Sequence, residues 1–292
     1  MASLKDIKQK IKGVSTTQQI TRAMKMMSTA RLGRAIEQIN LTHSYISKLE
    51  QIVRSLNEQL PENYQHPFII QRPVKSAAFV VVSGERGLCG GFNYELNKFA
   101  AKFIEESEAP VKKVILIGKK STRFFRKLPY EIVALYEELN MRNANESLFE
   151  VADQILNLYQ TASVDSVYLI YTAFISPTRK YVAGQKVLPL DTSRILEEEK
   201  IEEPQRKTLL SFDFEPSPTK IFDEIIPRFL RNLLHRAIIE SSASEQSARM
   251  AAMTSATDRA QEIIDELQLD FNRNRQALIT REIAEVISGS EA

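Results

Sequence analysis

Residues 39–60 read INLTHSYISKLEQIVRSLNEQL, and from Ile46 onward their apolar side chains recur at alternating steps of three and four residues. The mean step of 3.5 residues is the period of a left-handed coiled coil. The helical pattern extends back to Leu4, and Pro61 ends it because proline cannot continue a helix. The sequence therefore predicts one long helix, within a coiled-coil domain of residues 1–60.

The apolar pattern is less regular in the N-terminal half of this helix. After Ile11 the next apolar positions of the predicted seam are Ile20, Met24 and Met27. Gly13 and Gly33 lie inside the pattern, and each weakens a helix by about 1 kcal/mol relative to alanine. We expect the helix to continue through both glycines, with the three residues from Ile20 to Met27 in the seam.

The other end of the chain gives a second helical pattern. Residues 219–287 contain Pro227 as their single internal proline, and apolar residues recur at helical spacing after it. Two helices of similar length from opposite ends of one chain can pair antiparallel as a stalk, so we assign 219–292 to the second coiled-coil helix. An ordinary helical hairpin and a dimeric coiled coil remain alternatives on pattern alone.

The middle of the chain alternates between strand and helix patterns. The apolar, β-branched run AAFVVVS at 77–83 is typical of a buried parallel strand. Further strands are predicted at 114–118, 131–135, 167–172 and 187–190, with helices at 92–106, 119–127 and 145–160. This alternation predicts a Rossmann-like α/β domain over 75–190 with a mostly parallel, doubly wound sheet. The stretches 61–74 and 191–218 are predicted linkers.

The residues do not form a recognisable catalytic constellation. The glycines between Gly84 and Gly91 follow a strand but lack the spacing of a dinucleotide fingerprint, and GKKST at 118–122 lacks the register of a phosphate loop. The single cysteine, Cys89, has no base beside it in sequence and is more typical of a buried apolar residue. We therefore predict no catalytic residue, no cofactor and no metal. A nucleotide-binding α/β protein with helical arms remains the alternative.

Charge is distributed unevenly along a chain whose net charge is only +2. The first 34 residues carry eight lysines and arginines against one acid, Asp6, whereas EEEKIEE at 197–203 is strongly acidic. The basic end suggests acidic partners. A coiled-coil adaptor that binds acidic proteins or nucleic acid is a further alternative, although the overall charge does not indicate nucleic-acid binding.

The cellular compartment can be anticipated from the cysteine content, the apolar runs and the basic start of the chain. A chain with one cysteine cannot form an internal disulfide, which fits a reducing compartment. No apolar run reaches the 18 or so residues that span a bilayer. The basic start resembles a mitochondrial transit peptide in composition, but its helical pattern continues without a break. We expect an intracellular protein without a signal or transit peptide.

Four segments together identify a family. They are IKGVSTTQQITRAMKMMSTARLGRA near the N-terminus, SGERGLCGGFN in the middle, and SEQSARMAAMTSATDRAQEIIDEL and NRNRQALITREIAEVISG near the C-terminus. In composition, order and spacing they resemble the gamma subunit of the rotary F-type ATP synthase, over essentially the whole chain. The resemblance implies an antiparallel coiled coil from the two termini and a Rossmann-like domain without a nucleotide.

The resemblance also implies a function. Such a subunit is the non-catalytic rotor shaft that couples proton flow through a membrane ring to ATP synthesis or hydrolysis in a hexamer of alpha and beta subunits. The implied partners are the alpha, beta and epsilon subunits and the membrane c-ring, with no nucleic acid and no small-molecule substrate. The implied location is the cytoplasmic face of the cell membrane, as a peripheral protein.

Partner contacts follow from the matched motifs. The resemblance places Met24 and Arg249 near the collar where an acidic lever segment of the beta subunits meets the shaft, with Arg22, Lys25 and Arg31 in the same basic region. It places four further residues at the upper contacts with the hexamer: Gln276, Thr280, Glu282 and Glu285. Plainer interpretations are that Met24 is a seam residue, that Arg249 pairs with Glu245 on its own helix, and that the glutamates are solvated.

Overall fold

The computed structural model describes residues 3–61, 64, 66–137, 144–190 and 213–290. It divides into two compact units, one formed by Met1–Ala30 with Ala248–Ala292 and the other by Arg31–Ser247. The elements in chain order are α1 (Leu4–Gln59), β1 (Ser76–Val82), α2 (Phe92–Glu105), β2 (Val111–Ile117), α3 (Lys119–Phe125), β3 (Glu131–Tyr136), α4 (Ala144–Gln160), β4 (Ser166–Phe174), β5 (Lys180–Leu188) and α7 (Pro218–Ser290). The acidic stretch 197–203 lies outside the described residues, and the boundaries predicted for domains and linkers stay predictions.

The two long terminal helices are confirmed. α1 continues through Gly13 and Gly33 and ends just before Pro61, and α7 contains Pro227 in its interior. Within the described part of the chain, no helix combines the length and the apolarity that crossing a bilayer requires.

The five strands form one sheet in the order β3-β2-β1-β4-β5. β1 pairs parallel with both neighbours, so that Phe79 lies opposite Val114 of β2 on one side and Tyr168 of β4 on the other. β3 is parallel to β2, and β5 returns antiparallel to β4. The prediction of a mostly parallel sheet is thus confirmed. The sequence predicts the last strand only at 187–190, whereas β5 begins at Lys180 and pairs with most of β4.

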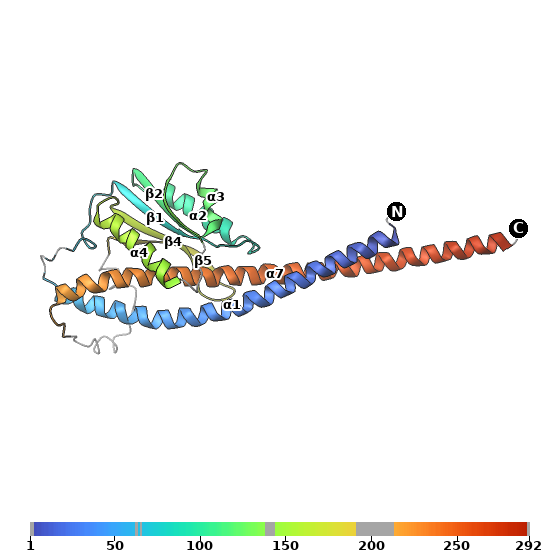
Figure 1. Ribbon diagram of the computed structural model, residues 1–292, viewed down its shortest axis with the longest axis horizontal. Helices are drawn as coiled ribbons and strands as arrows, with labels where there is room; N and C mark the ends of the chain where they lie inside the picture. The colour runs from blue at the N-terminus through green and yellow to red at the C-terminus, as the bar shows by residue number, and fades with distance from the viewer. Residues whose placement is uncertain (1–2, 62–63, 65, 138–143, 191–212, 291–292) are drawn as a thin grey trace. The chain divides into compact units, whose positions relative to one another are not determined.

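Both faces of the sheet are covered, as the continuous apolar run of β1 requires. Phe79 and Val81 face one core, which they share with Leu96 and Ala100 of α2 and Phe125 of α3. The alternate residues of β1 face the opposite core, which contains α4. Figure 1 shows α2 and α3 on one side of the sheet and α4 on the other.

The second core also takes in parts of both terminal helices within the larger unit. Val53 and Leu56 of α1 and Phe222 and Ile226 of α7 are buried together with the β1–β4 face and α4. Burying one such side chain is worth about 2 kcal/mol. The C-terminal half of α1 and the first turns of α7 are therefore integral to the α/β domain of this unit.

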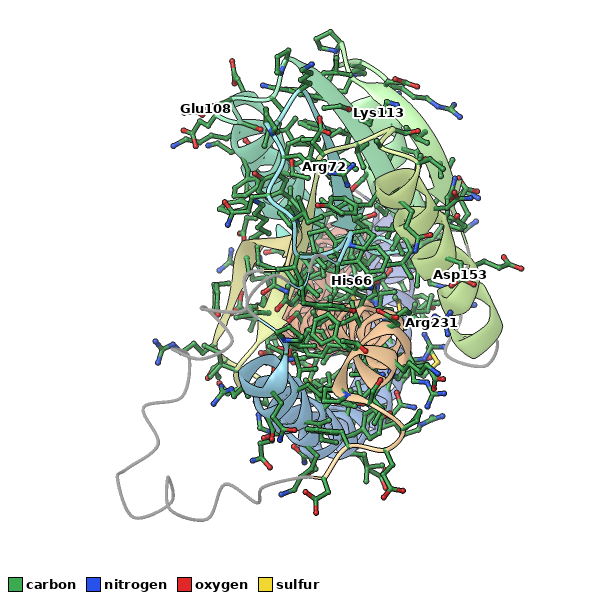
Figure 2. All side chains as sticks on the ribbon, turned by 90° about the vertical axis from the view of Figure 1, so that its left-hand side faces the viewer. His66, Arg72, Glu108, Lys113, Asp153 and Arg231 are labelled. Atoms are coloured by element: carbon green, nitrogen blue, oxygen red, sulfur yellow. The ribbon has the colours of Figure 1, made fainter. Side chains whose placement is uncertain are left out.

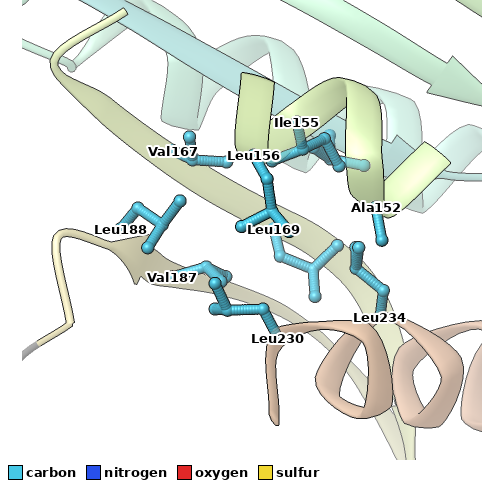
Figure 3. Close-up of a pocket in the computed structure, with 10 residues that line it drawn as sticks. Ala152, Ile155, Leu156, Val167, Leu169, Val187, Leu188, Leu230 and Leu234 are labelled. Atoms are coloured by element: carbon cyan, nitrogen blue, oxygen red, sulfur yellow. The ribbon is translucent and has the colours of Figure 1, made fainter. Parts of the chain in front are cut away.

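Polar contacts add to this packing. Arg231 of α7 donates to a carboxylate oxygen of Asp153 on α4 at 2.8 Å, and Figure 2 shows the two residues beside each other. A small apolar cavity of about 10 Å³ remains between Leu169 of β4, Ala152 of α4 and Leu230 of α7 (Figure 3). It is about the size of one water molecule and is lined by hydrocarbon, so it has no room or partner for a ligand.

Candidate functional site

The smaller unit is a pair of helical segments whose contact side chains follow a heptad pattern. On α1 a series of buried and half-buried positions follows alternating steps of three and four residues: Leu4, Ile7, Ile11, Val14, Gln18, Thr21, Lys25 and Ser28. Ser15 and Met24, each next to a member of this series, are half-buried as well. On α7 the same alternation holds for Met253, Thr257, Ala260, Ile264, Leu267, Phe271 and Asn274. This is the seam of a coiled coil.

Two hydrogen bonds establish how the helices run. The hydroxyls of Thr21 and Thr257 lie 2.8 Å apart, and the side-chain amide of Gln18 donates to the side-chain oxygen of Gln261 at 2.8 Å. Residue numbers rise along α1 while they fall along α7, so the segments are antiparallel. The predicted antiparallel pairing of the two termini is confirmed in this unit.

The centre of this seam is polar, and the predicted seam is wrong at Ile20 and Met27, whereas Met24 is half-buried. Ile20 and Met27 are 56% and 54% exposed, whereas Thr21 and Ser28 beside them are buried. The prediction followed the apolar residues. The true seam keeps the strict heptad spacing set by Ile7 and Val14, and places polar side chains at the contact positions. Polar residues in a seam fix the register of two helices at a cost in stability.

An open groove of about 650 Å³ lies beside the polar seam. It is lined by Gln18, Arg22, Lys25, Met26, Thr29, Ala30 and Thr257. The guanidinium of Arg22 and the ammonium of Lys25 give this groove a positive charge, and Met26 is 60% exposed. The groove therefore suits a partner segment that carries carboxylates together with some apolar surface. Of the residues predicted to contact a partner, Arg22 and Lys25 are brought together here.

The other residues predicted for the collar differ in accessibility. Met24 is half-buried on α1, and Arg31 is exposed at the beginning of the larger unit's part of α1. Arg249 is only 5% exposed. A contact between Arg249 and a partner remains a prediction, and its burial means that such a contact would need local rearrangement.

The C-terminal end of α7 extends past its pairing with α1. In the coiled-coil register Asn274 lies opposite Leu4, the first residue of α1, and α7 continues to Ser290. Gln276, Thr280 and Glu282 are exposed on this segment, and the side chain of Glu285 lies outside the described residues. Large apolar side chains are exposed on the same segment: Leu278, Ile279, Ile283 and Val286. A helix with such a surface is typical of one that enters an apolar partner site.

The crevice where an α/β sheet would bind a nucleotide is filled by the protein itself. Ligands of such folds bind outside the carboxyl ends of the strands, where the strand order reverses, here between β1 and β4. The hydroxyl of Ser241 donates to the Val82 carbonyl oxygen at the end of β1, and that of Ser244 donates to the Thr172 carbonyl oxygen near the end of β4. Side chains of α7 thus occupy this place, which argues against the nucleotide-binding alternative.

The glycine loop after β1 is likewise closed off. The carboxyl group of Glu245 lies so near that a β-carbon on Gly84 would be only 3.0 Å from it, and the carboxylate of Glu95 lies against Gly91 at the start of α2. Cys89 is buried and accepts a hydrogen bond from the Asn93 side-chain amide at 3.2 Å. Over the described residues no group of three or more histidine, cysteine, aspartate or glutamate side chains could hold a metal ion.

These features define a protein of paired terminal helices with an α/β domain, in which the candidate site is a contact surface. A family model described as ATP synthase matches residues 3–292. The ATP synthase gamma chain of Moorella thermoacetica is 36% identical over 292 residues, covering 100% of this chain and 99% of that one. That of Chlorobaculum tepidum is 37% identical over 298 residues, with the same coverage. The chain belongs to the ATP synthase gamma chain family.

Solved structures agree with this fold. A chain from the rotor of the Euglena gracilis mitochondrial ATP synthase superposes with a TM-score of 0.64 at 18% identity, covering 94% of this chain and 98% of that one. A chain from the central stalk and c-ring structure of the Tetrahymena thermophila enzyme gives a TM-score of 0.58 at 21% identity, covering 81% and 99%.

Proposed function

We propose that the chain is the rotor shaft of an F-type ATP synthase, a non-catalytic subunit that transmits rotation between a membrane ring and the catalytic hexamer. The observation that carries this proposal is the match to ATP synthase gamma chains over essentially the whole of residues 3–292. The antiparallel coiled coil of the two termini supports it, because a paired helix resists bending and twisting better than a loop-rich structure does.

Rotation of the shaft is coupled to the conformation of the catalytic sites because the shaft contacts each site differently. One asymmetric shaft inside a ring of three equivalent catalytic sites touches each site differently, and each contact favours a different conformation of that site. Because linkage is reciprocal, a change in nucleotide state at a site must in turn bias the orientation of the shaft. No catalytic group is needed on the shaft for this coupling, in agreement with the filled crevice of the α/β domain.

The positively charged groove is the surface proposed to meet the beta subunits. Arg22 and Lys25 line it, and complementary charge would orient an acidic lever segment of a beta subunit against them. Met24, Arg31 and Arg249 are proposed to belong to the same collar. Charged groups at an interface contribute more to the rate and orientation of association than to affinity.

The C-terminal extension of α7 is proposed to turn within the upper part of the alpha–beta hexamer. Its exposed apolar side chains, Ile283 and Val286 among them, suit an apolar sleeve with little resistance to rotation. Gln276, Thr280, Glu282 and Glu285 are proposed to make the polar contacts of this region.

The remaining partners are proposed from the family. The epsilon subunit and the c-ring would bind the α/β domain and the base of the helical pair. The similar Tetrahymena chain supports a contact with the ring, because it comes from a structure of the central stalk together with the c-ring. The chain would then be a peripheral protein of the complex, on the cytoplasmic face of the cell membrane.

Purification of the tagged chain from its native host tests this proposal. A tag at residue 1, and separately one within residues 197–203, guards against blocking assembly at one end. We expect recovery of one copy of the chain in a complex with alpha and beta subunits, with ATPase activity in the complex and none in the free chain. Recovery as a free monomer or homodimer that binds nucleotide would overturn the proposal.

A further inference from the structure

After α1, Tyr64 and the stretch that begins at His66 lie against the beginning of α7 and are held there by a polar cluster. The Tyr64 hydroxyl donates to a carboxylate oxygen of Asp223 at 2.7 Å, and the Nε2 atom of His66 lies 3.3 Å from the same oxygen. His66 is 8% exposed, and its ring packs edge-on against Phe222 with the ring centres 5.4 Å apart. Figure 2 labels His66 and, farther along the segment, Arg72.

The contacts of the His66 ring require its neutral form. Its Nδ1 atom accepts a hydrogen bond from the backbone N–H of Phe68 at 3.2 Å, so Nδ1 carries no proton. The proton of the neutral ring therefore lies on Nε2 and points to Asp223. A second proton could be added only at Nδ1, where it would face the Phe68 N–H and remove its acceptor.

The rest of the segment depends on this arrangement. The N–H groups of Ile69 and Ile70 both donate to the His66 carbonyl oxygen. Phe68 is 1% exposed, and its own carbonyl oxygen accepts a bond from the Leu190 N–H at 2.7 Å. Displacing the His66 ring would thus disturb the packing of the buried Phe68 and its hydrogen bond to Leu190, which follows β5.

Asp223 on α7 and Tyr64 on the same segment are the titratable groups that the structure places against His66. Asp223 favours a charged imidazole, but its side chain is 57% exposed and already accepts the Tyr64 bond, so water weakens its effect. Burial is the larger influence and lowers the pKa of His66 despite the carboxylate. Tyr159 of α4 packs against Phe68, with the ring centres 6.0 Å apart, and its ring carries the Arg72 guanidinium on its face.

We propose that Tyr64, His66 and Asp223 form an acid-sensitive latch, in which protonation of His66 at Nδ1 releases Tyr64 and residues 66–72 from the beginning of α7. At neutral pH the neutral ring accepts from Phe68 and donates to Asp223, and the latch is closed. As the pH falls, the open form binds the additional proton more readily than the closed form, and the opening equilibrium rises. The latch lies within the larger unit, so it does not depend on the proposed function of the chain.

Amide hydrogen exchange on the full-length chain tests the latch. Protection of the amides of Phe68, Ile69 and Ile70 is measured between pH 7.5 and 5, after correction for the intrinsic pH dependence of exchange. We expect protection to fall by up to tenfold for each pH unit below about 6.5, the pKa of an unperturbed histidine. Protection that stays constant over this range would overturn the proposal.

Three variants separate the latch from general acid destabilisation. His66→Asn offers a side-chain oxygen as acceptor but does not titrate here, so the pH dependence of protection that His66 contributes should be lost. Tyr64→Phe removes the hydroxyl bond but leaves His66, so the pH dependence should persist from a lower starting protection. His43→Asn, at an exposed position of α1, should match the wild type. A fall in protection that persists unchanged in His66→Asn would contradict the latch even if that variant is less stable overall.

Discussion

The hydroxyl groups of Thr21 in α1 and Thr257 in α7 lie 2.8 Å apart at the centre of the coiled-coil seam. Each also lies within hydrogen-bond distance of a carbonyl oxygen of its own helix, that of Gln18 for Thr21 and that of Met253 for Thr257. Each hydroxyl has one proton to donate, so two protons are available for these three contacts. The pair connects two positions more than two hundred residues apart in sequence. Because a hydrogen bond is directional, it fixes the register of the two helices more narrowly than packing alone does.

Replacing both threonines by valine should leave the coiled coil as stable or raise its free energy of unfolding by up to ~1 kcal/mol, because the two hydroxyls, one buried and one half-buried, give way to apolar groups of the same shape. Each single valine variant should be less stable than the double variant. Denaturant unfolding followed by helical circular dichroism measures this. Thr16→Val, at an exposed position of α1, is the control. A double variant less stable than either single variant would contradict this account of the hydroxyl pair.

Gly118 should not tolerate a side chain. Its φ of +94° lies in the region that favours glycine, and an added β-carbon would overlap the carbonyl oxygen of Ser83. Gly118→Ala should therefore lower the free energy of unfolding by about 3 kcal/mol or more. Gly13→Ala is the matched control, since open space surrounds that position in α1 and alanine should stabilise the helix by up to ~1 kcal/mol. Equal unfolding midpoints for the two variants would contradict this account of the turn.

Met24→Lys should weaken coupling while leaving folding intact. Met24 is half-buried and adjoins in sequence Lys25, which lines the cationic groove. A further positive charge there would disturb the fit of an acidic partner segment in the assembled complex. We expect fewer protons pumped per ATP hydrolysed, with an unchanged unfolding midpoint of the free chain. Gln19→Lys, which adds the same charge at an exposed position of the same helix, controls for charge alone. A normal ratio of pumping to hydrolysis in Met24→Lys would remove Met24 from the collar.

Stability should fall in mild acid. Burial lowers the pKa of His235 in α7. Burial also lowers the pKa of His66, because its effect is larger than the opposing effect of the Asp223 carboxylate. A histidine whose folded pKa lies below its unfolded value of about 6.5 binds its proton more readily in the unfolded state. The free energy of unfolding should therefore be greatest above about pH 6.5 and decline as the pH falls toward the folded pKa values. Denaturant titrations at pH 7.5 and 5.5 measure the decline.

His235→Gln isolates one of the two histidines. It should reduce the difference in stability between the two pH values without abolishing it, because His66 still titrates. The exposed His43 serves as the control, and His43→Gln should leave the difference unchanged. A decline that is equally steep in wild type and in His235→Gln would mean that His235 does not contribute.

The α/β domain could be predicted closely because its strands are continuous apolar runs with helices between them. β1 and α2 begin within one residue of their predicted starts, at Ser76 and Phe92. β5 was harder, since it is an edge strand whose first residues, from Lys180 to Lys186, are half-exposed or exposed and include Gly184. Such a strand lacks the apolar pattern on which a prediction depends, and pairing with β4 determines its length.

The seam of the coiled coil shows the opposite case. Ile20 and Met27 are apolar yet exposed, and Gln18, Thr21 and Ser28 hold the contact positions. Hydrophobic periodicity locates a seam only where the contact positions are occupied by apolar residues. Here the strict seven-residue spacing from Ile7 through Val14 was the better signal, and it could have identified Thr21 and Ser28. The groove beside the seam needs α7 next to α1, so neither sequence segment alone could predict it.

Rotation of this chain within its assembled complex is the central claim. The most direct measurement fixes the alpha–beta hexamer to a surface and follows a bead attached through a cysteine introduced at Tyr181, an exposed residue of β5, with Cys89 replaced by serine. On addition of ATP we predict sustained rotation in one direction, in steps separated by three pauses per turn that follow the threefold repeat of the catalytic sites. A bead that stays fixed while the same complexes hydrolyse ATP would contradict the account.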